Sequence, residues 1–131
     1  MIVLDTHALI WWVTGSALLS KKAKVAIERE HSYGELIVSS ITAWEIAMLV
    51  DQQKLTLSSD LRSWFAVVSS IPSIKFVNVD VDISLRSVAL PGSFHKDPAD
   101  RLIVATAQKL SAVLITKDQK IRAYPHVKTM W

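Results

Sequence analysis

The sequence contains no cysteine and few glycines or prolines, three and four respectively in 131 residues. Without cysteine, neither a disulfide framework nor thiolate chemistry is possible, which suits a reducing cytosol. Half of the residues are hydrophobic, a composition typical of globular proteins and not of disordered or fibrous ones. At this length we expect one domain, residues 1–131, with a core of its own.

Long apolar runs are also missing. None approaches the roughly 20 residues that a membrane-spanning helix requires. Residues 1–5 lack the positively charged and long apolar regions of a secretory signal. We therefore expect a cytoplasmic protein that does not insert into membranes.

The formal net charge is only +3, but the basic residues are grouped. Three clusters stand out: Lys21, Lys22 and Lys24; Lys117, Lys120 and Arg122; and His95, Lys96 and Arg101. Solvated helix faces explain them as well as phosphate contacts do.

Short apolar runs alternate with amphipathic helical patterns. We predict strands over 2–4, 36–38, 74–79, 112–115 and 127–130. We predict helices over 6–12, 20–33, 40–50, 58–71, 82–90 and 97–110, with a short turn over 116–121. This alternation predicts a three-layer α/β fold with a mostly parallel, five-stranded sheet, whose ligands bind at the carboxyl edge of the strands.

The segment 40–50 is apolar almost all the way round, as in a helix sunk in a core, yet Glu45 lies in its middle. A buried, unpaired carboxylate is costly, so it is usually neutralised, paired or bound to a metal. Ser39, Thr42 and Glu45 are spaced by three residues and form one polar stripe that needs a polar partner.

Three more acids are expected at the same sheet edge. Asp5 follows the first strand, Asp118 follows the fourth, and Asp100 lies in the first turn of the helix that leads into the fourth. Each of these three could simply cap or charge a helix N-terminus. Glu45 is different, because a residue in the middle of a helix caps nothing.

We call Asp5, Glu45, Asp100 and Asp118 the acidic quartet. Four adjacent carboxylates cannot all ionise without compensation, and a divalent cation such as Mg²⁺ supplies it through oxygen ligands. A cation held there can polarise a phosphoryl oxygen and activate a water molecule. With basic residues nearby, this predicts a Mg²⁺-dependent phosphodiesterase or phosphatase.

Two other classes with this architecture fit poorly. A phosphoacceptor receiver domain needs an acidic pair after the first strand and an aspartate ending a central apolar strand, and neither is present. A haloacid-dehalogenase-like phosphatase needs a second aspartate two residues after Asp5, where the sequence has His7.

Four segments resemble the PIN-domain ribonucleases, specifically the VapC-type toxins of type II toxin–antitoxin modules. They are residues 4–12 (LDTHALIWW), 39–47 (SSITAWEIA), 95–101 (HKDPADR) and 115–118 (ITKD). Their order and the chain length make the match specific, and it covers the whole chain. The resemblance implies a PIN-like α/β/α fold.

The resemblance also implies roles for single residues. The acidic quartet would hold Mg²⁺ or Mn²⁺ and be catalytic in the hydrolysis of RNA phosphodiester bonds. Auxiliary positions would be Thr6, Asp97, Thr116 and Arg101, of which Asp97 is sufficiently explained as a helix cap and Arg101 could contact phosphate or pair with a carboxylate. Substrate contacts would come from His95, Lys96 and Lys117. A homodimer, a cognate antitoxin and a higher assembly with that antitoxin are further implied.

Two alternative functions remain open at this point: a PIN nuclease of RNA processing outside any toxin module, and a PIN module that binds RNA or protein without cutting. Among the aromatic residues, Trp44 is expected in the core. Trp11 and Trp12 cannot both face one core. His7 and His95 are expected to be polar surface residues without the spacing of a metal ligand.

Overall fold

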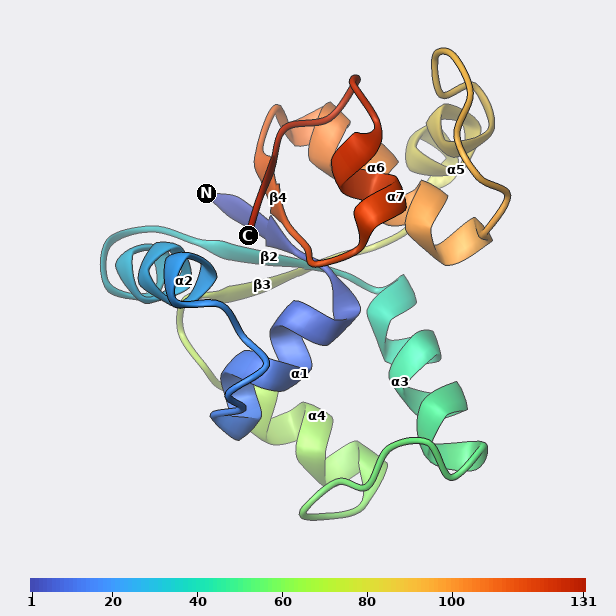
Figure 1. The fold of residues 1–131 in the computed structure, drawn as a ribbon. Helices are drawn as coiled ribbons and strands as arrows, with labels where there is room; N and C mark the ends of the chain where they lie inside the picture. The colour runs from blue at the N-terminus through green and yellow to red at the C-terminus, as the bar shows by residue number, and fades with distance from the viewer.

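The computed structural model describes residues 1–131 and is built around one sheet of five strands (Figure 1). The strands are β1 (Ile2–Leu4), β2 (Leu36–Ser39), β3 (Ile74–Val77), β4 (Val113–Ile115) and β5 (Thr129–Met130). Their order is β3-β2-β1-β4-β5, and every neighbouring pair is parallel. The predicted α/β fold with five strands is confirmed, and the sheet is parallel throughout.

Helices cover both faces of the sheet (Figure 1). They are α1 (Thr6–Thr14), α2 (Lys21–Tyr33), α3 (Ile41–Asp51), α4 (Leu61–Ser69), α5 (Val81–Val88), α6 (Pro98–Leu110) and α7 (Gln119–Ala123). Side chains of β1 alternate between two cores: Ile2 and Leu4 pack with α1, α2 and α4, whereas Val3 packs with α5, α6 and α7. Burial on both faces explains why the central strands are continuous apolar runs.

Two helix starts differ from those predicted, because an aspartate at another position caps each helix. Asp60 accepts the Ser63 amide and starts α4 after Ser58 and Ser59, the predicted starts. Asp80 similarly starts α5 one residue early, at Val81. Carboxylates are among the best acceptors at this position, which favours these starts.

Helix α3 is not sunk in the core, so that expectation is wrong. Only Thr42 and Ile46 are buried on it, and Trp44, expected inside, is 57% exposed. The helix lies at the edge of the molecule and packs against α1, α6 and β2 along one side (Figure 1). Its other apolar side chains are at the surface or half-buried.

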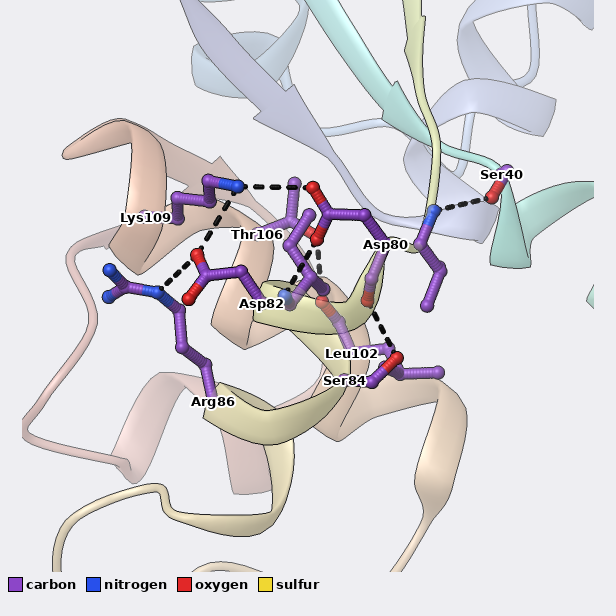
Figure 2. A network of polar contacts seen from close by, with 10 residues as sticks. Ser40, Asp80, Asp82, Ser84, Arg86, Leu102, Thr106 and Lys109 are labelled. Carbon is purple, nitrogen blue, oxygen red and sulfur yellow. Dashed lines mark hydrogen bonds and ion pairs between the residues drawn. The ribbon is translucent and has the colours of Figure 1, made fainter.

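An ion-pair network joins α5 to α6 (Figure 2). Lys109 Nζ lies 3.2 Å from a carboxylate oxygen of both Asp80 and Asp82, and Arg86 pairs with Asp82 at 2.9 Å. Nearby, the Val79 amide donates to Ser40 Oγ at 3.0 Å and thus fixes the end of β3 to the start of α3. The ion pairs therefore tie the C-terminal part of α6 to the start of α5.

None of the helices is long enough and apolar enough to span a membrane.

Candidate active site

Asp5 lies where β1 turns into α1. Its Oδ1 accepts the Ala8 amide at 2.8 Å and caps α1. The residue is 8% exposed. Burial raises the pKa of its carboxyl above the usual range, although hydrogen bonds from the Thr116 hydroxyl and the Ala8 amide oppose that increase. Because Thr116 directly follows β4, the ends of two neighbouring strands meet at this carboxyl.

Glu45 reaches towards Asp5 from the second turn of α3. Its Oε1 accepts a hydrogen bond of 2.5 Å from Thr6 Oγ1, which also lies 3.0 Å from Thr42 Oγ1. The Thr6 hydroxyl is thus a polar partner for two members of the stripe, Thr42 and Glu45. Burial raises the pKa of Glu45, and the negative charges of Asp97 and Asp5 raise it further despite the bond from Thr6.

Asp100 occupies the third position of α6, and Asp97 caps the same helix by accepting the Asp100 amide at 3.1 Å. Burial raises the pKa of Asp100 to about 7, with further increases from the charges of Asp97, Asp118, Glu45 and Asp5, in that order. Asp118 caps α7 by accepting the Ile121 amide at 3.0 Å. Thr116, the predicted cap of this turn, accepts the Asp118 amide instead.

The acidic quartet therefore surrounds one pocket. The hollow measures about 480 Å³ and is lined by Asp5, Thr6, His7, Trp11, Glu45, Asp97, Asp100, Ile103, Lys117 and Asp118. An adjoining hollow of about 650 Å³ shares three of these aspartates and is lined as well by His95, Lys96, Gln119 and Lys120. The convergence predicted from the ends of the strands is present in the structure.

His95 also belongs to this site, although its position in the sequence predicted a polar surface residue or a substrate contact and no metal ligand. Its Nε2 lies 3.1 Å from Asp100 Oδ2, is shielded from solvent and has no hydrogen-bond partner. One donor atom each of His95, Asp100 and Asp118 lie within 4.8 Å of one another. A cation with ligand bonds of roughly 2.2 Å spans about this distance.

Arg101 is used differently from the phosphate contact or carboxylate pair expected of it. Its guanidinium donates to the backbone carbonyls of Ser87, Val88, Phe94 and His95 at 2.8, 3.3, 3.1 and 3.2 Å. It also lies 5.9 Å from the centre of the Phe94 ring. Arg101 thus holds the loop that carries His95 against the end of α5. It does not line either hollow.

Basic side chains lie at the rim of the two hollows. Lys117 lines the first hollow, and Lys96 and Lys120 line the second. Lys21 and Lys22 are remote from the acids and line another hollow beside α2 with Arg29. The predicted basic clusters thus lie in different parts of the structure. Only Lys96, Lys117 and Lys120 line hollows that the acids also line.

The donors at the pocket fit a divalent cation. Carboxylate oxygens are the ligands that Mg²⁺ and Mn²⁺ prefer, and five of these groups line one hollow without a lysine or arginine paired to them. His95 Nε2, which makes no hydrogen bond but lies 3.1 Å from Asp100 Oδ2, adds a nitrogen donor at the edge. Burial first, and the negative charges of the neighbouring acids second, raise the pKa values of Asp5, Glu45 and Asp100, and a cation bound among them would oppose both effects.

Several known proteins are similar to this chain in sequence or in fold. Ribonuclease VapC22 of Mycobacterium tuberculosis is 36% identical over 132 residues, which cover 99% of this chain and 98% of that protein. A toxin-antitoxin complex from Klebsiella pneumoniae contains a chain with 26% identity and a TM-score of 0.64, and the match covers 97% of this chain and 95% of that one. VapBC2 from Rickettsia felis, solved bound to a DNA fragment from its promoter, matches with a TM-score of 0.70, 17% identity and coverage of 99% and 98%. Residues 2–127 match the family model of the PIN domain. The chain therefore belongs to the PIN-domain family, as a relative of a VapC ribonuclease over nearly its whole length.

Proposed function

We propose that this protein is a Mg²⁺- or Mn²⁺-dependent endoribonuclease and the toxin component of a toxin–antitoxin module. The observation that carries the proposal is the convergence of the acidic quartet from four separate segments on one pocket. A site of unneutralised carboxylates is unfavourable unless it binds cations, and basic side chains beside it favour a polyanionic substrate. The relative named as a ribonuclease supports RNA as that substrate.

The residues of the pocket have distinct tasks in this proposal. Asp5, Glu45, Asp100 and Asp118 would hold the cation, with Asp97 close enough to contribute. When bound, the cation neutralises these carboxylates, lowers the pKa of a coordinated water molecule and stabilises charge on the phosphoryl oxygens.

Proton release prepares the site. With a pKa of about 7, Asp100 must lose its proton before it can serve as a ligand near neutral pH. The hydroxyls of Thr6 and Thr116 hold Glu45 and Asp5 in place by donating to their carboxylates. Lys96, Lys117 and Lys120, which line the two hollows, would contact RNA phosphates.

Protein partners are part of the proposal. The structural neighbours are toxin–antitoxin complexes, which supports an antitoxin partner, alone or in a higher assembly. For a homodimer, the supporting feature is a stripe of exposed apolar residues on α5: Val81, Leu85 and Val88, which are 75%, 66% and 80% exposed. We expect Leu85→Lys to lower the mass measured in solution, and an unchanged mass would remove α5 from the interface.

The activity is tested with purified protein, a single-stranded RNA and Mg²⁺ or Mn²⁺. The wild type should cleave internal phosphodiester bonds, and EDTA should stop the reaction. Asp5→Asn and Asp100→Asn should reduce the cleavage rate by 100-fold or more, an order of magnitude typical when a metal or charge-stabilising group is removed.

Asp51→Asn is the matched control, because Asp51 is an exposed aspartate at the far end of α3. It should cleave at the wild-type rate. If Asp5→Asn and Asp100→Asn cleave as fast as this control, the activity does not arise from the pocket and the proposal fails. Growth arrest that is relieved by co-expression of the neighbouring gene would support the toxin assignment.

A further inference from the structure

The adjacent residues Trp11 and Trp12 point to different parts of the molecule, because successive residues of a helix are turned by about 100°. Trp12 points to α2, where its Nε1 donates to Glu28 at 3.2 Å and its ring lies 5.2 Å from the His31 ring. Trp11 instead lines the acidic pocket. Helix α1 thus presents one of its two tryptophans to the candidate active site.

Trp11 is the largest aromatic side chain in the lining of a pocket that is mostly polar and charged. The other apolar residue of the lining, Ile103, is 1% exposed, whereas Trp11 is half-buried. The ring is supported from the side by His7 and Trp131, whose ring centres lie 5.3 and 5.7 Å away. A large ring that its neighbours hold at the edge of a charged hollow can receive another flat, apolar group.

The Lys117 ammonium group beside Trp11 indicates that the ligand of this ring also carries an anion. Lys117 Nζ lies over the Trp11 ring, 5.6 Å from its centre, and the Lys117 side chain is exposed. A ligand that places a π-face on Trp11 would displace this ammonium group and bring its own anion within reach of it. Nucleotides combine a stacking base with a phosphate, and single-stranded nucleic acids are commonly bound on aromatic rings flanked by basic residues.

We propose that Trp11 forms a nucleobase-stacking subsite beside the acidic quartet, with His7 packed against its ring and Lys117 available to pair with a phosphate. It holds one unpaired base of a single-stranded RNA while the acids face a neighbouring phosphate. The inference rests on the proposed ribonuclease function for its choice of RNA. It adds a contact that depends on a base and not only on the charge of the backbone.

The test compares RNA with bases against RNA without them. Fluorescence anisotropy measures the affinity of labelled oligoadenylate and of an abasic ribose-phosphate oligomer of equal length, both with Mg²⁺. All proteins carry Asp100→Asn, so that binding is measured without cleavage. The variants are Trp11→Leu, Trp11→Phe and, as the matched control on the same helix, Trp12→Leu.

We expect Trp11→Leu to weaken oligoadenylate binding by roughly 10- to 100-fold, because stacking on one ring contributes about that factor. Binding of the abasic oligomer should stay within threefold. Trp11→Phe should retain most of the affinity and Trp12→Leu all of it, which separates stacking from a loss of folding. Equal losses for both oligomers in Trp11→Leu, or no loss for either, would overturn the inference.

The two proposals fail in different ways. If wild-type protein with Asp100 intact does not cleave oligoadenylate, but binding still depends on Trp11 and on the bases, the nuclease assignment fails and the stacking subsite stands. If cleavage depends on the acidic quartet but Trp11→Leu leaves base-dependent binding unchanged, only the subsite is wrong.

Discussion

Thr6 Oγ1 donates a hydrogen bond of 2.5 Å to Glu45 Oε1, and this bond crosses the candidate active site. Thr6 is 3% exposed and follows Asp5 directly, whereas Glu45 belongs to α3. The bond therefore joins α1 to α3 and sets two carboxylates of the acidic quartet side by side. The Thr6 hydroxyl offsets only part of the cost of burying the Glu45 carboxylate, since the pKa of Glu45 remains raised.

Glu45→Gln should stabilise the protein in EDTA while abolishing RNA cleavage. The glutamine amide oxygen still accepts from Thr6, but the charge that burial and the aspartates disfavour is gone. We expect the melting temperature at pH 8 to rise by roughly 1–4 °C, measured by circular dichroism. The exposed Glu35→Gln is the control and should change neither quantity. A lower melting temperature for Glu45→Gln would contradict the electrostatic argument.

The stability of the protein in EDTA should fall as the pH rises from about 4 towards 8. Asp100 has a folded-state pKa of about 7 against an ordinary value of 3.8, so in this range the folded protein binds more protons than the unfolded chain. Stability decreases with pH wherever the folded state holds the extra proton. Urea unfolding at several pH values measures this slope, and Asp100→Asn should flatten it.

Saturating Mg²⁺ should weaken or reverse that slope, because a cation binds the ionised carboxyl and competes with the proton. The same linkage predicts that cation affinity and cleavage rate increase as the pH rises through about 7. A stability profile identical with and without Mg²⁺ would mean that Asp100 takes no part in cation binding.

His95→Ala should weaken Mn²⁺ and Co²⁺ binding more than Mg²⁺ binding. Imidazole nitrogen is a poor ligand for Mg²⁺ and a better one for transition metals, and His95 Nε2 lies beside Asp100 and Asp118 without making a hydrogen bond. We expect at least a tenfold loss for Co²⁺ by calorimetry, with partial recovery on adding imidazole. The exposed His126→Ala should bind as the wild type does. Equal changes for all three cations would exclude His95 as a ligand.

Arg101→Lys should loosen the loop over residues 89–96, which follows α5, without removing a charge. A lysine ammonium cannot reproduce the planar set of bonds to four carbonyls, so some of them lose their donor. We expect a loss of about 1–3 kcal/mol in stability and faster hydrogen exchange in this loop. Arg86→Lys, which alters a solvent-exposed pair on α5, should have little effect. Unchanged exchange in the loop would show that Arg101 does not hold it.

Much of the fold could be predicted because local and tertiary preferences agree. Residues 2–4 and 36–38 are apolar throughout, and in the structure they are strands buried on both faces. The parallel arrangement then brings Asp5 and Asp118 to one edge, since both follow strand ends. The positions of the acids could be predicted for the same reason that the sheet could.

Other features depend on contacts between distant residues and leave no periodic signal. Trp44 was expected inside, because an apolar helix does not reveal whether its second face meets a core or remains at the surface. His95 reaches Asp100 along a loop whose course is set by Arg101 and by the Tyr124 hydroxyl, which donates to the Pro91 carbonyl at 2.5 Å. No pattern within residues 89–96 records those partners.

Asp5, Asp97 and Asp118 each begin a helix with the carboxylate that also faces the pocket. One side chain therefore serves both the architecture and the chemistry, and a mutation cannot remove the two separately unless an equivalent acceptor remains. Asparagine retains the cap, whereas alanine loses it at about 1 kcal/mol for each helix. Selection for inactive variants that remain folded should consequently favour Asn over Ala at these positions. Alanine alleles would reduce cellular abundance as well as activity.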